Sequence, residues 1–159
     1  MAATTWLDLQ RRVIPGSGLG TSIMKFFDNG TEAYIALKFT AQTNCARGEV
    51  VCFDQANNQR VIPVPTGGNS HDMPIGVAAE QIAAGSAGWV AIMGLVYVLP
   101  DAAITAAVGY VMTTSTTTAG LVAQAATIPA AAVHFDEVGH WYENGAGNGV
   151  MARAVIHFN

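Results

Sequence analysis

Four residues near the C-terminus have side chains that commonly bind metal ions: His134, Asp136, Glu137 and His140. On a β-strand, His134 and Asp136 would project from the same face, as two ligands of one ion do. A protein zinc site normally has at least three protein ligands, and only His71 or His157 remains to supply one from elsewhere. The sequence places neither of them. We therefore predict no functional metal site and interpret the group as solvated edge or interface residues.

Other arrangements that support catalysis are missing from the sequence. It contains no Gly-x-Ser-x-Gly nucleophile elbow and no carboxylate pair of the glycosidase type. His71 and Asp72 fall in an expected loop without a nucleophile, and neither Cys45 nor Cys52 has an evident base partner. The glycine-rich segment 16–21 departs from the dinucleotide-binding pattern and is interpreted as a linker. We predict that the protein is not an enzyme and holds no cofactor.

Two further groups could bind a ligand. The threonine-rich run 113–118 could bind ice or sugar through a flat array of hydroxyl groups, although a surface β-ribbon or loop is the simpler interpretation. Trp89, Trp141 and Tyr142 could stack on ligand rings, but such residues more often anchor a core or an interface. We interpret Trp141 and Tyr142 as interface residues.

The composition indicates a protein that buries surface in an assembly. Charged residues make up 11% of the 159 residues, against about 25% in an average soluble domain. Hydrophobic residues make up 51%, so little charge is left to keep copies of a small monomer apart. The net charge of −4 argues against nucleic acid as a partner, because nucleic acid requires a basic face.

Neither export nor membrane insertion is indicated. The first six residues lack the basic and apolar regions of a signal peptide, and the apolar run 89–99 is too short to span a bilayer. Cys45 and Cys52 are therefore expected to be buried thiols, not a disulfide.

The stretch from Ile75 to Pro100 predicts two strands joined by a glycine turn. Gly85 and Gly88 bracket the turn, and the apolar run that follows is typical of a strand buried on both faces. Gly94 interrupts this run and predicts a bulge or a sharp bend, as at a barrel corner.

The rest of the chain repeats the pattern of short strands and turns. Asn29-Gly30 predicts a hairpin between strands near 23–27 and 31–39, and Ala119-Gly120 predicts another turn. A short helical turn is expected over 101–107, with Asp101 as its N-cap. Short strands at this spacing are typical of an all-β protein, and we predict a small β-barrel or β-sandwich.

We divide the chain into an extended N-terminal arm over 1–24 and a β-rich domain over 25–159. The arm is glycine-punctuated, yet it carries apolar residues that a free tail would not need: Trp6, Leu7, Leu9, Val13 and Ile14. We predict that these residues lie on a neighbouring subunit.

The order of motifs between residues 45 and 159 resembles the small capsid decoration, or cement, proteins of tailed bacteriophages. The motifs that carry the resemblance are Gly48-Glu49-Val50-Val51, Ile75-Gly76-Val77-Ala78, the segment 89–97, Gly109-Tyr110-Val111, Val138-Gly139 and the segment 152–156. The resemblance implies a β-rich decoration domain, a homotrimer bound to the major capsid protein, and reinforcement of the shell. It also implies a protein made in the host cytoplasm and located on the capsid surface of the virion, without catalytic residues.

Two alternatives remain open at this point. The chain could be a head-fibre or glycan- and receptor-binding module, which would use exposed aromatic residues such as Trp141 and Tyr142. It could instead be a metal-dependent hydrolase built on His134 and His140.

Overall fold

The computed structural model describes residues 24–66, 72–102, 104–125, 137–147 and 149–158. These residues form ten strands and no helix, so the predicted all-β class is confirmed. The strands are β1 (Met24–Asp28), β2 (Ala33–Ala41), β3 (Val50–Asp54), β4 (Asn57–Pro63), β5 (Pro74–Ala78), β6 (Ala87–Val98), β7 (Val111–Thr114), β8 (Val122–Ala125), β9 (Glu137–Trp141) and β10 (Ala152–Ile156). The described part of the chain accordingly offers no helix long and apolar enough to cross a membrane.

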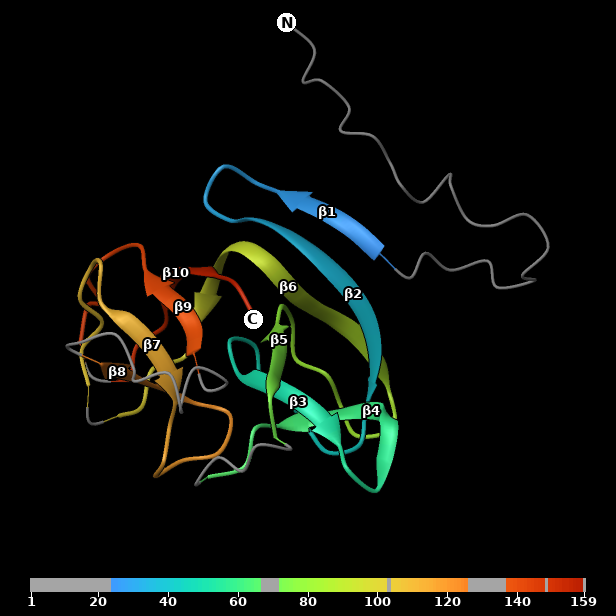
Figure 1. Ribbon diagram of the computed structural model, residues 1–159. Coiled ribbons are helices and arrows are strands. Elements are labelled where there is room, and N and C mark those ends of the chain that lie inside the picture. The colour runs from blue at the N-terminus through green and yellow to red at the C-terminus, as the bar shows by residue number, and fades with distance from the viewer. Residues whose placement is uncertain (1–23, 67–71, 103, 126–136, 148, 159) are drawn as a thin grey trace, which may run out of the picture.

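Five of the strands close into a small barrel (Figure 1). The strand order is β2-β4-β3-β5-β6, and a direct pairing between β6 and β2 completes the ring. All of these pairings are antiparallel except β2 with β4, which is parallel and short, joining Thr40 to Arg60 and Ala41 to Val61. The predicted barrel is therefore confirmed.

The remaining strands extend from the barrel on two sides. The second half of β6 pairs with β10, and the sheet continues through β9 and β7 to β8. At the other end, β1 pairs with β2 alone among the described strands and forms a hairpin above the barrel (Figure 1). Because β6 borders β2, β5 and β10, it connects the barrel, the hairpin and the second sheet.

Residues at the centre of the barrel are buried on both faces of their strands, most completely in β3 and β5. A first apolar cluster draws one residue from each of the five barrel strands, together with two loop residues, and so fills the barrel: Ala41, Cys45, Val51, Val61, Ala78, Ile82 and Val90. Their neighbours Val50, Val77 and Ala91 point the opposite way and join a second cluster with residues of β7, β9 and β10. This second cluster packs the barrel against the other sheet. Burial on both faces explains the continuous apolar runs in β3 and β5.

Glycines allow the strands to approach closely where the two layers meet. Gly94 has φ +113°, and a Cβ there would lie 2.4 Å from the carbonyl oxygen of Ala33. Gly139 has φ +145°, and a Cβ there would lie 2.1 Å from the carbonyl oxygen of Val155. Ile156 stands between them in the register, opposite Gly94 on β6 and Gly139 on β9. The predicted irregularity at Gly94 is confirmed by the positive φ and by the adjacent register shift between β2 and β6.

The expected helical turn over 101–107 is confirmed only as a single turn, which Ile104 closes by donating its N–H to the carbonyl oxygen of Asp101 at 3.0 Å. No helix is assigned to the described residues of this segment, and later N–H groups bond outward: Ala107 donates to Gln124 and Val108 donates to Asn144. The carboxylate of Asp101 does not cap a helix, because it accepts hydrogen bonds from the hydroxyl groups of Ser115 and Thr117. The two cysteines are free and buried, as expected.

A first prediction concerns the glycines. We expect Gly139→Ala to lower the free energy of unfolding by about 3 kcal/mol or more, because the methyl group meets backbone atoms that cannot move aside. For a chain of this size, that loss corresponds to a fall of about 6–12 °C in the melting temperature measured by circular dichroism. Gly147→Ala is the matched control, since a Cβ there meets nothing within 4 Å. Equal stability of the two variants would contradict the argument.

Candidate interaction surfaces

The interface residues predicted from the sequence differ in whether the structure describes them and in how exposed they are. Trp6, Leu7, Leu9, Val13 and Ile14 lie outside the described residues, as does most of the predicted arm. Trp141 is 2% exposed and belongs to the hydrophobic core, so its side chain does not reach the surface. Tyr142 is 53% exposed and is available to a partner. Of the two predicted aromatic anchors, only Tyr142 therefore remains a candidate surface residue.

An apolar surface covers the outer side of the hairpin and the bend of β6. The register places Phe26 opposite Ile35, Ile35 opposite Met93, and Leu95 opposite Val155. Residues opposite one another on paired strands project from the same face. Phe26, Met93 and Val155 are exposed, with Met93 at 55%. We call these five residues the hairpin face; contiguous exposed apolar residues of this kind usually mark an interaction site.

A pocket of about 400 Å³ opens beside the hairpin face. It is lined by Phe26, Phe27, Asp28, Ala33, Tyr34, Ile35, Met93 and Gly94. The rings of Phe27 and Tyr34 stack with centroids 4.8 Å apart. Burial, and secondly the charge of Glu32, raises the pKa of Tyr34 to about 12, so its hydroxyl keeps its proton at neutral pH. The pocket is thus an apolar cavity of the size that takes a small ligand or a bulky side chain.

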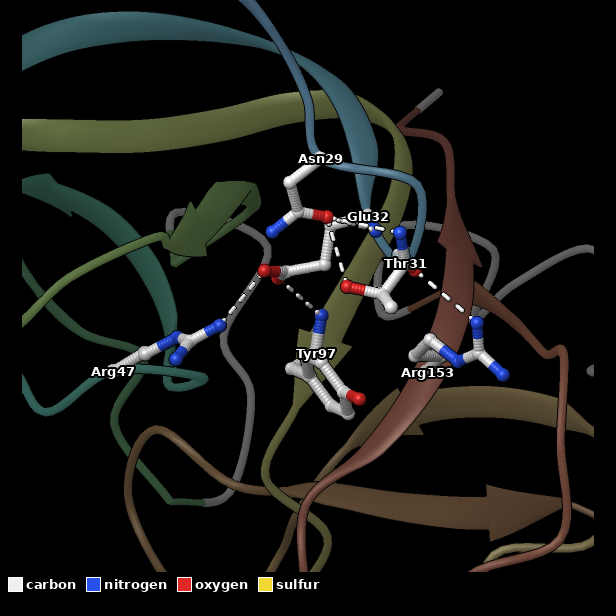
Figure 2. A network of polar contacts seen from close by, with 6 residues as sticks. All are labelled: Asn29, Thr31, Glu32, Arg47, Tyr97 and Arg153. Carbon is white, nitrogen blue, oxygen red and sulfur yellow. Dashed lines mark hydrogen bonds and ion pairs between the residues drawn. The ribbon is translucent and has the colours of Figure 1, made fainter.

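A polar network holds the hairpin turn against the barrel (Figure 2). Asn29 Oδ1 accepts hydrogen bonds from the backbone N–H groups of Thr31 at 2.9 Å and Glu32 at 2.8 Å, which closes the turn. Glu32 is 4% exposed, and its carboxylate binds Arg47 at 2.8 Å and the backbone N–H of Tyr97 on β6 at 3.1 Å. The buried carboxylate therefore has a partner on each oxygen, as a buried charge requires.

Arg153 on β10 ties the same turn to the second sheet. Its Nη1 donates to the carbonyl oxygen of Thr31 at 3.2 Å, as Figure 2 shows. Its Nε and Nη2 bind one carboxylate oxygen of Glu143 at 2.8 and 2.7 Å, and this hydrogen bonding lowers the pKa of Glu143. The guanidinium also lies over the ring of Tyr142, 5.4 Å from its centroid. The network thus connects the hairpin to the loop that carries Tyr142.

A second set of exposed apolar residues lies on the loops that flank the second sheet. It consists of Val108, Tyr110, Tyr142 and Val150, which we call the loop face. The two loops are joined by hydrogen bonds from Trp141 N–H to the carbonyl oxygen of Tyr110 and from Val108 N–H to Asn144 Oδ1, each 3.0 Å long. Sequence reasoning found Tyr142 but missed its neighbours, because an isolated exposed valine has no signature in the sequence.

The threonine-rich run does not form a flat array of hydroxyl groups over its whole length. Residues 113 and 114 end β7, whereas Ser115 and Thr117 turn inward and donate to the carboxylate of Asp101. Ser115 Oγ also accepts the backbone N–H groups of Thr117 and Thr118, both at 3.1 Å. Part of the run therefore builds a turn around one buried carboxylate, in agreement with the simpler loop interpretation.

The structure brings together a different set of candidate metal ligands from the set expected from the sequence. His134, Asp136 and His71 lie outside the described residues. Glu137 and His140 lie on β9, and His157, directly after β10, lies beside them. His140 Nδ1 is 3.2 Å from His157 Nε2, and His157 Nε2 is 3.7 Å from a carboxylate oxygen of Glu137. The expectation that no third ligand converges is therefore corrected, because the pairing of β9 with β10 supplies His157.

The cysteines are poorly suited to nucleophilic chemistry. Burial raises the pKa of Cys45 from the ordinary value of 9.0 to about 11, and it raises the pKa of Cys52 to about 12. The nearby charges of Asp72 and Asp54 add to the effect at Cys52. A thiol must ionise to attack, so neither side chain is activated at neutral pH.

The sequence matches no protein-family profile and no curated protein. Among solved structures, the chain is similar to one described as the crystal structure of head fiber gp8.5 N base in bacteriophage phi29. The TM-score is 0.52 at 16% sequence identity, and the match covers 76% of this chain and 92% of that chain. This similarity establishes a shared fold.

A second prediction tests the network around Glu32. We expect Arg47→Ala and Glu32→Ala each to lower the free energy of unfolding by about 2 kcal/mol, because each leaves a polar group at the hairpin without its partner. The double variant should cost clearly less than the sum of the two, since the residues contact each other. Arg60→Ala is the control, because Arg60 makes only an exposed hydrogen bond to Gln42 in the described structure. Denaturant unfolding measures all four variants, and additive losses would contradict a coupled pair.

A third prediction concerns the two thiols. At pH 8 we expect a thiol reagent to leave both cysteines unlabelled in the folded protein and to label two in denaturant. The free energy of unfolding should fall as the pH rises above about 9, because unfolded thiols then lose protons that the folded ones retain. Rapid labelling of folded protein at pH 8, read by mass spectrometry, would refute the burial argument.

Proposed function

We propose that this protein is a structural component of the outer surface of a bacteriophage head, where it decorates and stabilises the capsid as a homotrimer. The single observation that carries the proposal is the fold shared with the base of the phi29 head fibre. The family resemblance of residues 45–159 agrees with it. The protein is made in the host cytoplasm and is located on the capsid surface of the virion. Its partners are the major capsid protein and its own copies.

The two exposed apolar faces fit a protein that makes two kinds of contact. In this proposal the hairpin face binds neighbouring copies and the loop face, with Tyr142, binds the capsid. A cyclic trimer covers the hairpin face of every copy without open-ended growth. Burial of apolar area contributes about 25 cal/mol per Å², less the cost of association. Repetition over the shell gives avidity to contacts that are individually modest.

The N-terminal arm belongs to the same proposal. The arm precedes β1 directly, and β1 borders the apolar pocket. In the trimer, the apolar residues of the arm, Trp6, Leu7, Leu9, Val13 and Ile14, lie on the neighbouring subunit. The pocket beside the hairpin face is suited to a large side chain such as Trp6. This contact would add area to each trimer interface at the position where the chain leaves the barrel.

The proposal assigns no catalytic role and no nucleic-acid partner. Both cysteines have raised pKa values, and the net charge of −4 opposes binding to phosphate backbones. Only 11% of the residues are charged, which suits a protein whose surface is largely shared with neighbours.

The similarity to the phi29 structure favours a second candidate function. There the shared fold belongs to the base of a head fibre, so this chain could be a fibre base or a receptor- or glycan-binding module on the head. A fibre base has to bind the capsid, but it does not have to strengthen the capsid. The two functions therefore differ in what bound protein does to the stability of the head.

A fourth prediction tests assembly. Light scattering of the purified protein should give three times the chain mass of 16.5 kDa. Met93→Glu, on the hairpin face, should give a monomer, because it buries an unpaired charge at each subunit contact. Tyr142→Ala should remain trimeric but bind undecorated heads at least about tenfold more weakly. Thr116→Glu, at an exposed turn, is the control and should change neither property.

Capsid binding and reinforcement are measured by mixing the trimer with undecorated heads. Electron microscopy should show protein on the outer surface, and decorated heads should survive heating that opens bare heads. Heads that bind the protein yet open at the same temperature as bare heads would favour the fibre base. A monomer at micromolar concentration without affinity for heads would refute both functions.

A further inference from the structure

Glu137 and His140 are three residues apart, so on a regular strand they would point to opposite faces. The register with β7 removes this conflict. Val111 lies opposite His140 and Thr113 lies opposite Glu137. Val111 and Thr113 are two residues apart on β7, whereas Glu137 and His140 are three residues apart on β9. Val138 is therefore the extra residue of a β-bulge, next to Gly139 with its positive φ. The bulge turns Glu137 to the same face as His140.

The pairing of β9 with β10 brings His157 to this face as well. Val155 lies opposite His140, and His157 is two residues beyond Val155 on the same side of the strand. The backbone N–H of His157 donates to the carbonyl oxygen of Val138 at 3.1 Å, which fixes the position of His157 beside the bulge. Three potential ligands thus converge from two strands on one face.

The distances between the ligand atoms suit a transition-metal ion. Two ligands that each lie about 2.1 Å from zinc at the tetrahedral angle are about 3.4 Å apart. His140 Nδ1 and His157 Nε2 are 3.2 Å apart, and His157 Nε2 and Glu137 Oε1 are 3.7 Å apart. All three ligand atoms lie within 4.8 Å of one another. Small side-chain rotations would bring the remaining pair to the distance that one ion requires.

We propose that Glu137, His140 and His157 bind a Zn²⁺ ion with three protein ligands and one open position. Two imidazoles and one carboxylate are ligands that zinc accepts, whereas calcium and magnesium prefer oxygen ligands throughout. Glu137 is buried, and the side chain of His157 is 38% exposed, so the open position faces outward. Water or a group from a neighbouring molecule would complete the tetrahedron.

The bound ion would link β9 to the end of β10. Glu137 and His140 lie on β9 and His157 follows β10, so one ion joins two strands of the second sheet. An ion that binds only the folded protein stabilises it by mass action. This inference stands independently of the proposed capsid function, because it rests only on the three side chains.

The test uses full-length protein without an affinity tag, stripped with a chelator and then titrated with Zn²⁺ alone. Calorimetry should show one equivalent bound per chain. Zinc at about 100 times its dissociation constant should raise the melting temperature by about 5 °C or more. Co²⁺ should give the intense visible absorption of a tetrahedral site, which reports the coordination geometry. The chelator should reverse both effects.

Variants connect the binding to these residues. His157→Ala and His140→Ala should each weaken zinc binding at least about tenfold and abolish the thermal shift. His157→Ala keeps the backbone hydrogen bond to Val138, so the fold is retained, which circular dichroism checks. Glu80→Gln is the control and should bind zinc normally, because Glu80 lies beside β6 of the barrel, where its carboxylate accepts the N–H of Trp89. Absence of binding, or binding that is unchanged in both histidine variants, would overturn the proposal.

Discussion

The close packing of four strands around Ile156 is the constraint on which the rest of the structure depends. Ile156 is fully buried, and it lies between Gly94 on β6 and Gly139 on β9. Each glycine has a positive φ and stands where a Cβ would collide with backbone of the next strand. A side chain at either position would separate the strands and open the second cluster of the core, because packed interiors transmit such strain. The junction of barrel and second sheet therefore needs these two glycines.

The same junction determines which side chains reach the surface. The bend at Gly94 presents Met93 on one side, while the second half of β6 continues beside β10. The bulge beside Gly139 turns Glu137 toward His140. Glu32 then fixes the hairpin against β6, because its buried carboxylate is stable only with Arg47 and the N–H of Tyr97 in place. The hairpin face and the histidine cluster are thus consequences of how β6, β9 and β10 are packed.

Local signals in the sequence were enough to predict most strands. They were not enough to predict which side chains the paired strands bring together. Asn29-Gly30 and Ala119-Gly120 predicted turns correctly, because glycine at positive φ is a local requirement of a tight turn. The helical turn expected after Pro100 is limited to one turn, and the Asp101 carboxylate does not cap a helix because it is engaged by Ser115, a partner fourteen residues away. His157 could not be assigned to the histidine cluster, since only the register of β10 against β9 brings it there. Strand type is local information, whereas register and bulges depend on the whole sheet.

Several of the few charged residues in the chain position the hairpin. Glu32 with Arg47 and Glu143 with Arg153 both contribute to fixing the hairpin turn, so these four charged groups serve internal positioning. The hairpin face and the loop face both carry exposed apolar side chains. A surface of this kind would make a free monomer prone to association, and closed assembly is the arrangement that removes the hazard. The proposed assembly would cover these apolar faces, whereas the ion pairs that orient the hairpin do little to keep separate copies apart.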